Sequence, residues 1–193
     1  MKQKVKSVTI KLGGRCNLKC KHCHNAVIDY DKNPDTIKWI KDSGAKNIIF
    51  SGGEPTLYFD LIKKIVVTLG KGISYSFVTN ATLLTDDMVN FINEYNISVV
   101  TSYDGELSER DFSYIPDYRK IGKINNHGLT SVFYGQNTTL SQLQYEVDTF
   151  RKKYWNEDSI ASFYPNFAHQ TKLSPGDNIN QETVIKYVTE YGG

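Results

Sequence analysis

The chain lacks most of the features that mark secreted, membrane-bound or nucleic-acid-binding proteins. Cysteine is scarce: the 193 residues contain three, an odd number that excludes a closed disulfide framework. No apolar run reaches membrane-spanning length, and no apolar segment of a signal peptide follows the basic N-terminus. The 23 basic and 21 acidic residues nearly cancel, so charge gives no reason to expect binding to nucleic acid or to a membrane surface. We therefore expect a protein of the reducing cytoplasm.

Low-complexity stretches and obvious linkers are absent as well, so nothing divides the chain into parts. With 39% hydrophobic and 23% charged residues, the composition is ordinary for a globular protein. A chain of 193 residues is long enough to bury a sizeable core. We expect residues 1–193 to form a single domain.

All three cysteines, Cys16, Cys20 and Cys23, lie within eight residues, directly after a β-like run. Thiolates are the usual ligands of iron–sulfur clusters, and three of them leave one iron of a cubane cluster open to a small molecule. A structural zinc site is the alternative, with His22 or His24 as the fourth ligand. The spacing disfavours zinc, because zinc sites usually pair one C-x2-C with a distant second pair.

Strand-like and helix-like segments alternate along the chain with short breaks between them. Strands are expected at 5–12, 47–51, 73–79, 97–103, 129–134 and 159–164. Helices are expected at 35–43, 57–69, 86–95, near 117–126, at about 141–154 and at 181–191. Repeated strand–helix units imply parallel strands joined by right-handed crossovers. Six such units form either a curved, incomplete barrel or an open doubly wound sheet.

The residues that could bind a ligand or take part in a reaction follow the ends of these strands. In parallel α/β folds the functional sites lie at the carboxyl ends of the strands, so these loops are expected to share one rim. After the cysteines come Ser51-Gly52-Gly53-Glu54-Pro55, Thr79-Asn80, Ser102-Tyr103-Asp104-Gly105 and Gln136-Asn137-Thr138. Simple turn chemistry explains the Gly, Asn, Asp and Pro in these loops. It does not explain a cysteine triad and a Gly-Gly-Glu-Pro after the first two strands.

Taken together, the cysteine triad and the Gly-Gly-Glu-Pro motif resemble the radical S-adenosylmethionine (SAM) enzymes. In that family C-x3-C-x-aromatic-C holds a 4Fe–4S cluster and GGEP follows the second strand. The resemblance implies an α/β fold, a partial (β/α)6 TIM-like barrel. The stretches 77–84 and 102–105 look most like SPASM-type peptide-modifying enzymes. Cys23-His24-Asn25 is similar instead to the activases of glycyl radical enzymes.

The resemblance assigns the cofactors, which are a 4Fe–4S cluster and SAM. Cys16, Cys20 and Cys23 would hold three irons, and the fourth would chelate the amino and carboxylate groups of SAM. One electron would then cleave SAM to a 5′-deoxyadenosyl radical. Backbone carbonyls around Gly53 and Glu54 would accept hydrogen bonds from the SAM amino group.

The motif after the second strand also has simpler explanations. Gly52 and Gly53 allow close approach of the backbone to a ligand, but they also suit a simple turn at the end of a strand. Glu54 has the alternative of a surface carboxylate. A β-branched residue at Gly53 is expected to block SAM while leaving the iron content near normal.

Further cofactor contacts are expected from polar residues on the other loops. In the family, the aromatic position before the third cysteine lies against adenine, and here it is His22. Arg110 would pair with the SAM carboxylate, and Asn137 would contact adenine or substrate. The ribose hydroxyls and the SAM carboxylate are assigned to Thr79, Asn80, Ser102 and Asp104. Turn capping and a solvated surface arginine are the alternatives for these residues.

The expected activity is hydrogen-atom abstraction from carbon in a peptide or protein substrate. With Cys23 as the last cysteine, no auxiliary clusters are expected, so electrons would come from an external flavodoxin or ferredoxin-like donor. Neither nucleic acid nor a membrane is an expected partner. Two alternatives remain open: a glycyl-radical-enzyme activase, and an iron–sulfur or zinc binding module that does not cleave SAM.

Overall fold

The described strands of this protein form one parallel sheet. The computed structural model describes residues 5–20, 23, 35–103, 118–133 and 162–167, with the single residues 141, 145, 148, 149 and 152. Within this part of the chain the sheet has six strands, hydrogen-bonded in chain order. They are β1 (Ser7–Lys11), β2 (Asn47–Ser51), β3 (Ser74–Thr79), β4 (Ser98–Ser102), β5 (His127–Phe133) and β6 (Ser162–Phe167).

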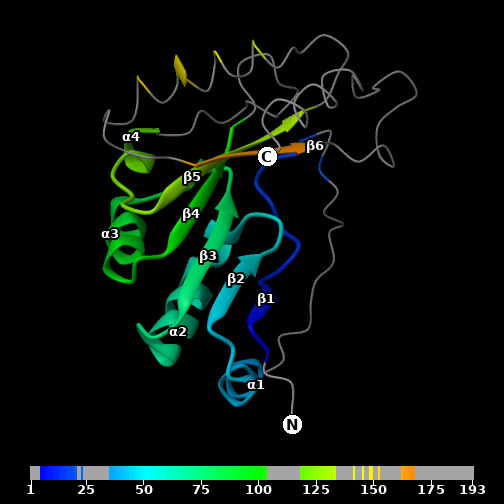
Figure 1. Ribbon diagram of the computed structural model, residues 1–193, viewed down its shortest axis with the longest axis vertical. Helices are drawn as coiled ribbons and strands as arrows, with labels where there is room; N and C mark the ends of the chain where they lie inside the picture. The colour runs from blue at the N-terminus through cyan, green and yellow to red at the C-terminus, as the bar shows by residue number, and fades with distance from the viewer. Residues whose placement is uncertain are drawn as a thin grey trace, which may run out of the picture.

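The helices connect successive strands and cover one face of the sheet (Figure 1). They are α1 (Thr36–Ser43), the 3-10 helix η1 (Pro55–Tyr58), α2 (Phe59–Leu69), α3 (Asp86–Glu94) and α4 (Tyr118–Ile121). A doubly wound sheet reverses its strand order part-way, whereas right-handed crossovers between consecutive neighbours keep the helices on one side. The unbroken order therefore confirms the partial barrel and excludes the doubly wound alternative. None of the described helices is long and apolar enough to cross a bilayer.

Helix ends follow the signals in the sequence. The Thr85 side chain accepts a hydrogen bond from the Met88 N–H at 3.2 Å and begins α3, as expected. Gly44, at φ +71°, ends α1 in the left-handed conformation that favours glycine. The segment expected as one helix over 57–69 differs: it begins as η1 at Pro55, because Pro55 suits a first helical position and Glu54 caps it. The α-helix then starts at Phe59.

The last strand is shifted from its expected position at 159–164. The expected strand stopped at Tyr164, before Pro165. Instead β6 continues to Phe167, with Pro165 paired in register with Ser131. In the described part of the sheet β6 is an edge strand, where proline is tolerated. The expected helix at 181–191 lies outside the described residues, and only single residues of the expected 141–154 helix are described.

The core lies between the helices and the sheet face that they cover. Alternate strand residues point into it and are buried, including Ile48, Phe50, Tyr75, Phe77 and Val99. The other face, called here the open face, carries the intervening residues of the first four strands, which are exposed or half-buried. These are Ser7, Thr9, Lys11, Asn47, Ile49, Ser51, Ser74, Ser76, Val78, Ser98, Val100 and Ser102.

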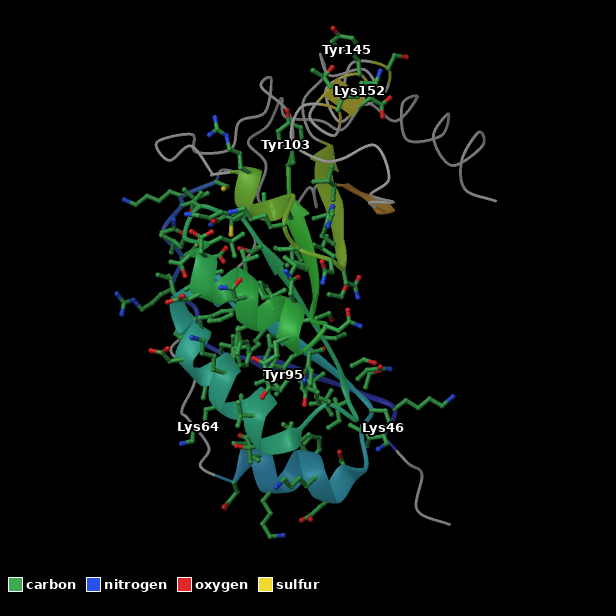
Figure 2. The ribbon with its side chains drawn as sticks, turned by 90° about the vertical axis from the view of Figure 1, so that its left-hand side faces the viewer. Lys46, Lys64, Tyr95, Tyr103, Tyr145 and Lys152 are labelled. Atoms are coloured by element: carbon green, nitrogen blue, oxygen red, sulfur yellow. The ribbon has the colours of Figure 1, made fainter. Side chains whose placement is uncertain are left out.

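The parallel strands give the molecule two distinct ends. Figure 2 shows Tyr103, which follows β4, near one end, and Lys46, which precedes β2, towards the other. The loops after β1, β2, β3 and β4 all leave from the end that Tyr103 marks. This carboxyl rim carries the predicted site residues.

Candidate functional site

The three cysteines lie in the loop that follows β1. Buried Leu18 anchors this loop, and its backbone N–H donates to the Cys16 sulfur at 3.4 Å. A turn closes the other end, where the Cys23 N–H donates to the Cys20 carbonyl at 3.0 Å. All three cysteines belong to the described residues, and none of them forms a disulfide.

The donor set, three thiols on one loop, fits a cubane cluster. Among the described residues, no three His, Cys, Asp or Glu side chains gather closely enough to hold one metal ion. The ligands of a cubane cluster each bind a different iron, so three thiols spread along one loop suit it. The zinc alternative requires His22 or His24, and both lie outside the described residues.

Partial burial of the sulfur raises the pKa of Cys16 above its ordinary value, and the negative charge of Glu54 adds to this. The N–H of Leu18 acts in the opposite direction. A metal binds the thiolate, so ligation at Cys16 must displace the proton that this environment favours.

The Gly-Gly-Glu loop after β2 packs directly on the backbone that precedes the cysteines. The Gly53 N–H donates to the Gly13 carbonyl at 3.0 Å, and the Glu54 N–H donates to the Arg15 carbonyl at 2.9 Å. A Cβ atom at Gly53 would lie 2.2 Å from the Arg15 carbonyl oxygen, and one at Gly52 would lie 2.5 Å from that of Gly13. The two glycines therefore let the two loops touch.

This contact corrects the expectation for a β-branched residue at Gly53. Such a side chain would first collide with the Arg15 backbone, next to Cys16, and would disturb the cysteine loop itself. Near-normal iron content is therefore no longer expected. Close approach of Gly53 to SAM stays a prediction.

Glu54 is a buried carboxylate, with 2% of its surface exposed, so the surface alternative is wrong. One carboxylate oxygen accepts from the Thr56 N–H at 3.0 Å and from the hydroxyls of Thr56 and Thr79, each at 2.6 Å. The other accepts from the Asn80 N–H at 2.9 Å. Four donors compensate the buried charge and join the loop after β2 to the end of β3.

Asn80 extends this network to the cysteine loop. Its side-chain amide donates to the Asn17 Oδ1 at 3.0 Å and lies 3.9 Å from the Cys16 sulfur. The Asn17 amide donates in turn to the Thr82 hydroxyl at 2.7 Å. The loops after β1, β2 and β3 are therefore one hydrogen-bonded unit.

The comparison with protein families identifies the superfamily of this chain. A family model described as the Radical SAM superfamily matches residues 10–107, a segment that includes the cysteine and Gly-Gly-Glu loops and half of the chain. The chain belongs to the radical SAM superfamily. The family's cofactors are a 4Fe–4S cluster and SAM, as the sequence predicted.

The relatives that this chain matches are longer than the chain itself. The S-adenosylmethionine-dependent nucleotide dehydratase of Thermoplasmatales archaeon (strain ISO4-H5) is 34% identical over 90 residues, which cover 44% of this chain and 33% of that protein. The radical SAM cyclopropyl synthase TigE of Paramaledivibacter caminithermalis is 25% identical over 193 residues, covering 86% of this chain and 40% of TigE. This chain therefore spans well under two thirds of either relative.

A solved structure with the same fold is Streptococcus suis SuiB bound to the precursor peptide SuiA. The two superimpose with a TM-score of 0.68 at 20% identity, over 98% of this chain and 47% of the SuiB chain. This likeness confirms the partial-barrel fold of a radical SAM core.

The remaining predicted radical SAM contacts are only partly described. Thr79 is buried, and its hydroxyl donates to Glu54, a role in joining the loops that the sequence did not reveal. Ser102 ends β4 on the open face and is half-buried. Four of the residues predicted to contact SAM lie outside the described residues, and their contacts stay predictions: His22, Asp104, Arg110 and Asn137.

Sequence reasoning missed several residues that shape this candidate site. Asn17 and Thr82 complete the bonds around Asn80, and Tyr58 holds the cysteine loop by accepting from the Arg15 N–H at 3.0 Å. The Tyr58 ring also fills the space beside Gly13, where a Cβ atom would lie 2.3 Å from the tyrosine oxygen. No motif marks these residues, because their partners are distant in the sequence.

Proposed function

We propose that this chain is the catalytic core of a radical SAM enzyme that acts on a peptide or protein. Cys16, Cys20 and Cys23 would hold the cluster as thiolates, and the backbone of Gly53 and Glu54 would bind the SAM amino group. When bound, the cofactors supply the one-electron chemistry that removes a hydrogen atom from carbon. The main observation behind this proposal is that the Gly-Gly-Glu loop packs directly against the cysteine loop.

The chain's own part in this chemistry is to place two ligand sites against each other. The Glu54 carboxylate is buried and fully occupied by protein donors, so we assign it to fixing the loops and not to touching SAM. The Glu54 carbonyl accepts from the Leu57 N–H at 3.2 Å. A carbonyl oxygen has a second lone pair, which remains suited to an ammonium group.

The open face supports a large, extended substrate. Ile49 and Val78 are 39% and 48% exposed there, although both are aliphatic residues of inner strands. Across β1 to β4 this face carries small polar and aliphatic side chains, with Lys11 as its one charged residue. Such a surface offers width and apolar contact to a peptide. Because it runs up to the carboxyl rim, a substrate lying on it would reach the cofactors.

Some known relatives support a peptide substrate, and another supports a nucleotide substrate. The names of TigE and of the SuiB–SuiA complex point to a cyclopropyl synthase and to a precursor peptide, respectively. The nucleotide dehydratase, at 34% identity, favours a nucleotide as the second candidate substrate. A glycyl-radical-enzyme activase would also act on a protein, so it falls within the first class.

The test is an anaerobic assay of the reduced protein that measures 5′-deoxyadenosine with and without candidate substrates. We expect precursor peptides encoded beside the gene to raise the rate and to change in mass, with deuterium passing from the labelled peptide carbon into 5′-deoxyadenosine. The Cys20→Ala variant, assayed with the same peptides, should be inactive.

Two outcomes would contradict the proposal. If nucleoside triphosphates raise the rate and are altered while peptides are not, the chain acts on nucleotides. If no 5′-deoxyadenosine forms under any condition in an iron-loaded protein, the chain is a binding module.

A further inference from the structure

The side chain of Asn80 is aimed at the sulfur of Cys16. The Asn80 amide nitrogen has two hydrogens: it lies 3.0 Å from the Asn17 Oδ1 and 3.9 Å from the Cys16 Sγ. The sulfur atom is large, so 3.9 Å is within the reach of an N–H···S hydrogen bond. Asn80 is only 8% exposed, which leaves water little access to compete for this donor.

The surrounding bonds fix which end of the Asn80 amide faces the sulfur. Its oxygen accepts from the Thr82 backbone N–H at 3.0 Å and from the Thr82 hydroxyl at 2.7 Å. A flipped amide would set its NH2 group against that backbone donor, so the network allows one orientation. The Asn80 backbone N–H is held in turn by the buried Glu54 carboxylate.

A donor at this position acts on the electron that a cluster accepts. Hydrogen bonds to the sulfurs are among the factors that set the reduction potential of an iron–sulfur cluster. The added electron increases negative charge on the ligand sulfurs, and an N–H dipole held in place by other hydrogen bonds stabilises that charge.

We propose that the Asn80 side chain donates a hydrogen bond to the Cys16 thiolate of the cluster and thereby raises the cluster's reduction potential. Asn80 is thus a positioning and tuning residue of the cluster, distinct from its predicted contact with SAM. This inference rests on the proposed role of Cys16 as a cluster ligand.

The test compares reduction potentials without SAM, by redox titration followed by electron paramagnetic resonance (EPR). Asn80→Leu keeps the size of the side chain but removes the donor. In this variant we expect the equilibrium constant for cluster reduction to fall roughly tenfold, which lowers the reduction potential by about 59 mV for a one-electron couple. Asn80→Asp should lower the potential further, because it adds a negative charge. The matched control is Asn93→Leu on α3. Asn93 also donates and accepts hydrogen bonds, with Lys123 and Asn125, and its variant should keep the wild-type potential.

Iron content distinguishes a failure of the proposed cluster from a failure of the proposed Asn80 hydrogen bond. A wild-type protein without iron would defeat the proposed function itself. If the Asn80→Leu variant alone fails to hold iron, the Thr82→Val variant is measured in its place. Thr82→Val removes one hydrogen bond to the Asn80 amide oxygen and leaves the donor to the sulfur present. We expect it to lower the reduction potential by less than Asn80→Leu would. An unchanged or raised potential in Asn80→Leu, or in Thr82→Val where that variant decides, would overturn the inference.

Discussion

At the scale of single residues, Glu54 determines how the loops after β1, β2 and β3 meet. Its carboxylate is nearly fully buried, and donors from Thr56, Thr79 and Asn80 surround it. A buried charge is tolerated only when it is hydrogen-bonded in this way, and removing it leaves its partners unsatisfied. The carboxylate thus links the stability of the fold to the geometry of the site.

We predict that Glu54→Ala lowers the free energy of unfolding by about 2–5 kcal/mol, because each buried donor left unpaired costs about 1–3 kcal/mol. The measurement is the midpoint of urea unfolding. Glu94, exposed at the end of α3, provides the control: Glu94→Ala should stay within about 0.5 kcal/mol of wild type. Equal midpoints for the two variants would show that the buried network contributes nothing.

Gly53 gives a second prediction at this scale. Gly53→Ala places a methyl group 2.2 Å from the Arg15 carbonyl oxygen, so the cysteine loop must shift. We expect iron content after anaerobic reconstitution to fall at least several-fold. In Gly72→Ala the new methyl group meets nothing within 4 Å, and iron content should match wild type. Similar losses in both variants would contradict the packing argument.

The sequence drew attention to the cysteine and Gly-Gly-Glu loops but not to the bonds between them. The cysteines and Gly-Gly-Glu-Pro stand out because their residue types and spacing are rare outside this chemistry. The hydrogen bond between Asn17 and Thr82 joins residues 65 positions apart, and asparagine and threonine are common in turns. Their part in the site follows from the folded backbone alone.

At the scale of elements, apolar alternation and glycine stops predicted most helices and strands. β2 has the expected bounds, and α1 and α2 end before Gly44 and Gly70 as expected. One error is the helix expected near 117–126, which is limited to α4 (Tyr118–Ile121). The others occur at prolines, where local chemistry competes with context. Pro55 starts a 3-10 turn before α2, and Pro165 is accommodated inside β6.

The open face gives the prediction at this scale. Val78→Trp on β3 would place a large ring where we expect the substrate to lie, while Trp still suits a strand. We expect peptide modification to fall at least tenfold, with iron content near wild type. Val67→Trp is the matched control, because Val67 is 58% exposed on α2, on the opposite side of the sheet. Equal activity of the two variants would argue against binding on this face.

At the scale of the whole molecule, the consecutive order of the strands is what brings the site together. Neighbouring strands in sequence are neighbours in space, so the loops after β1, β2 and β3 emerge side by side at the carboxyl rim. The strand–helix pattern by itself left a barrel and a doubly wound sheet open, because both use the same units, and the resemblance to the radical SAM enzymes favoured the barrel. Only the pairing of the strands distinguishes them.

The central claim is that the three cysteines hold a 4Fe–4S cluster whose open iron binds SAM. The most direct measurement is the EPR spectrum of the anaerobically reconstituted, reduced protein, recorded before and after SAM is added. We predict one 4Fe–4S cluster per chain, a signal that SAM shifts, and no such signal in Cys20→Ala. Zinc in place of iron, or a cluster signal that SAM leaves unchanged, would contradict the claim.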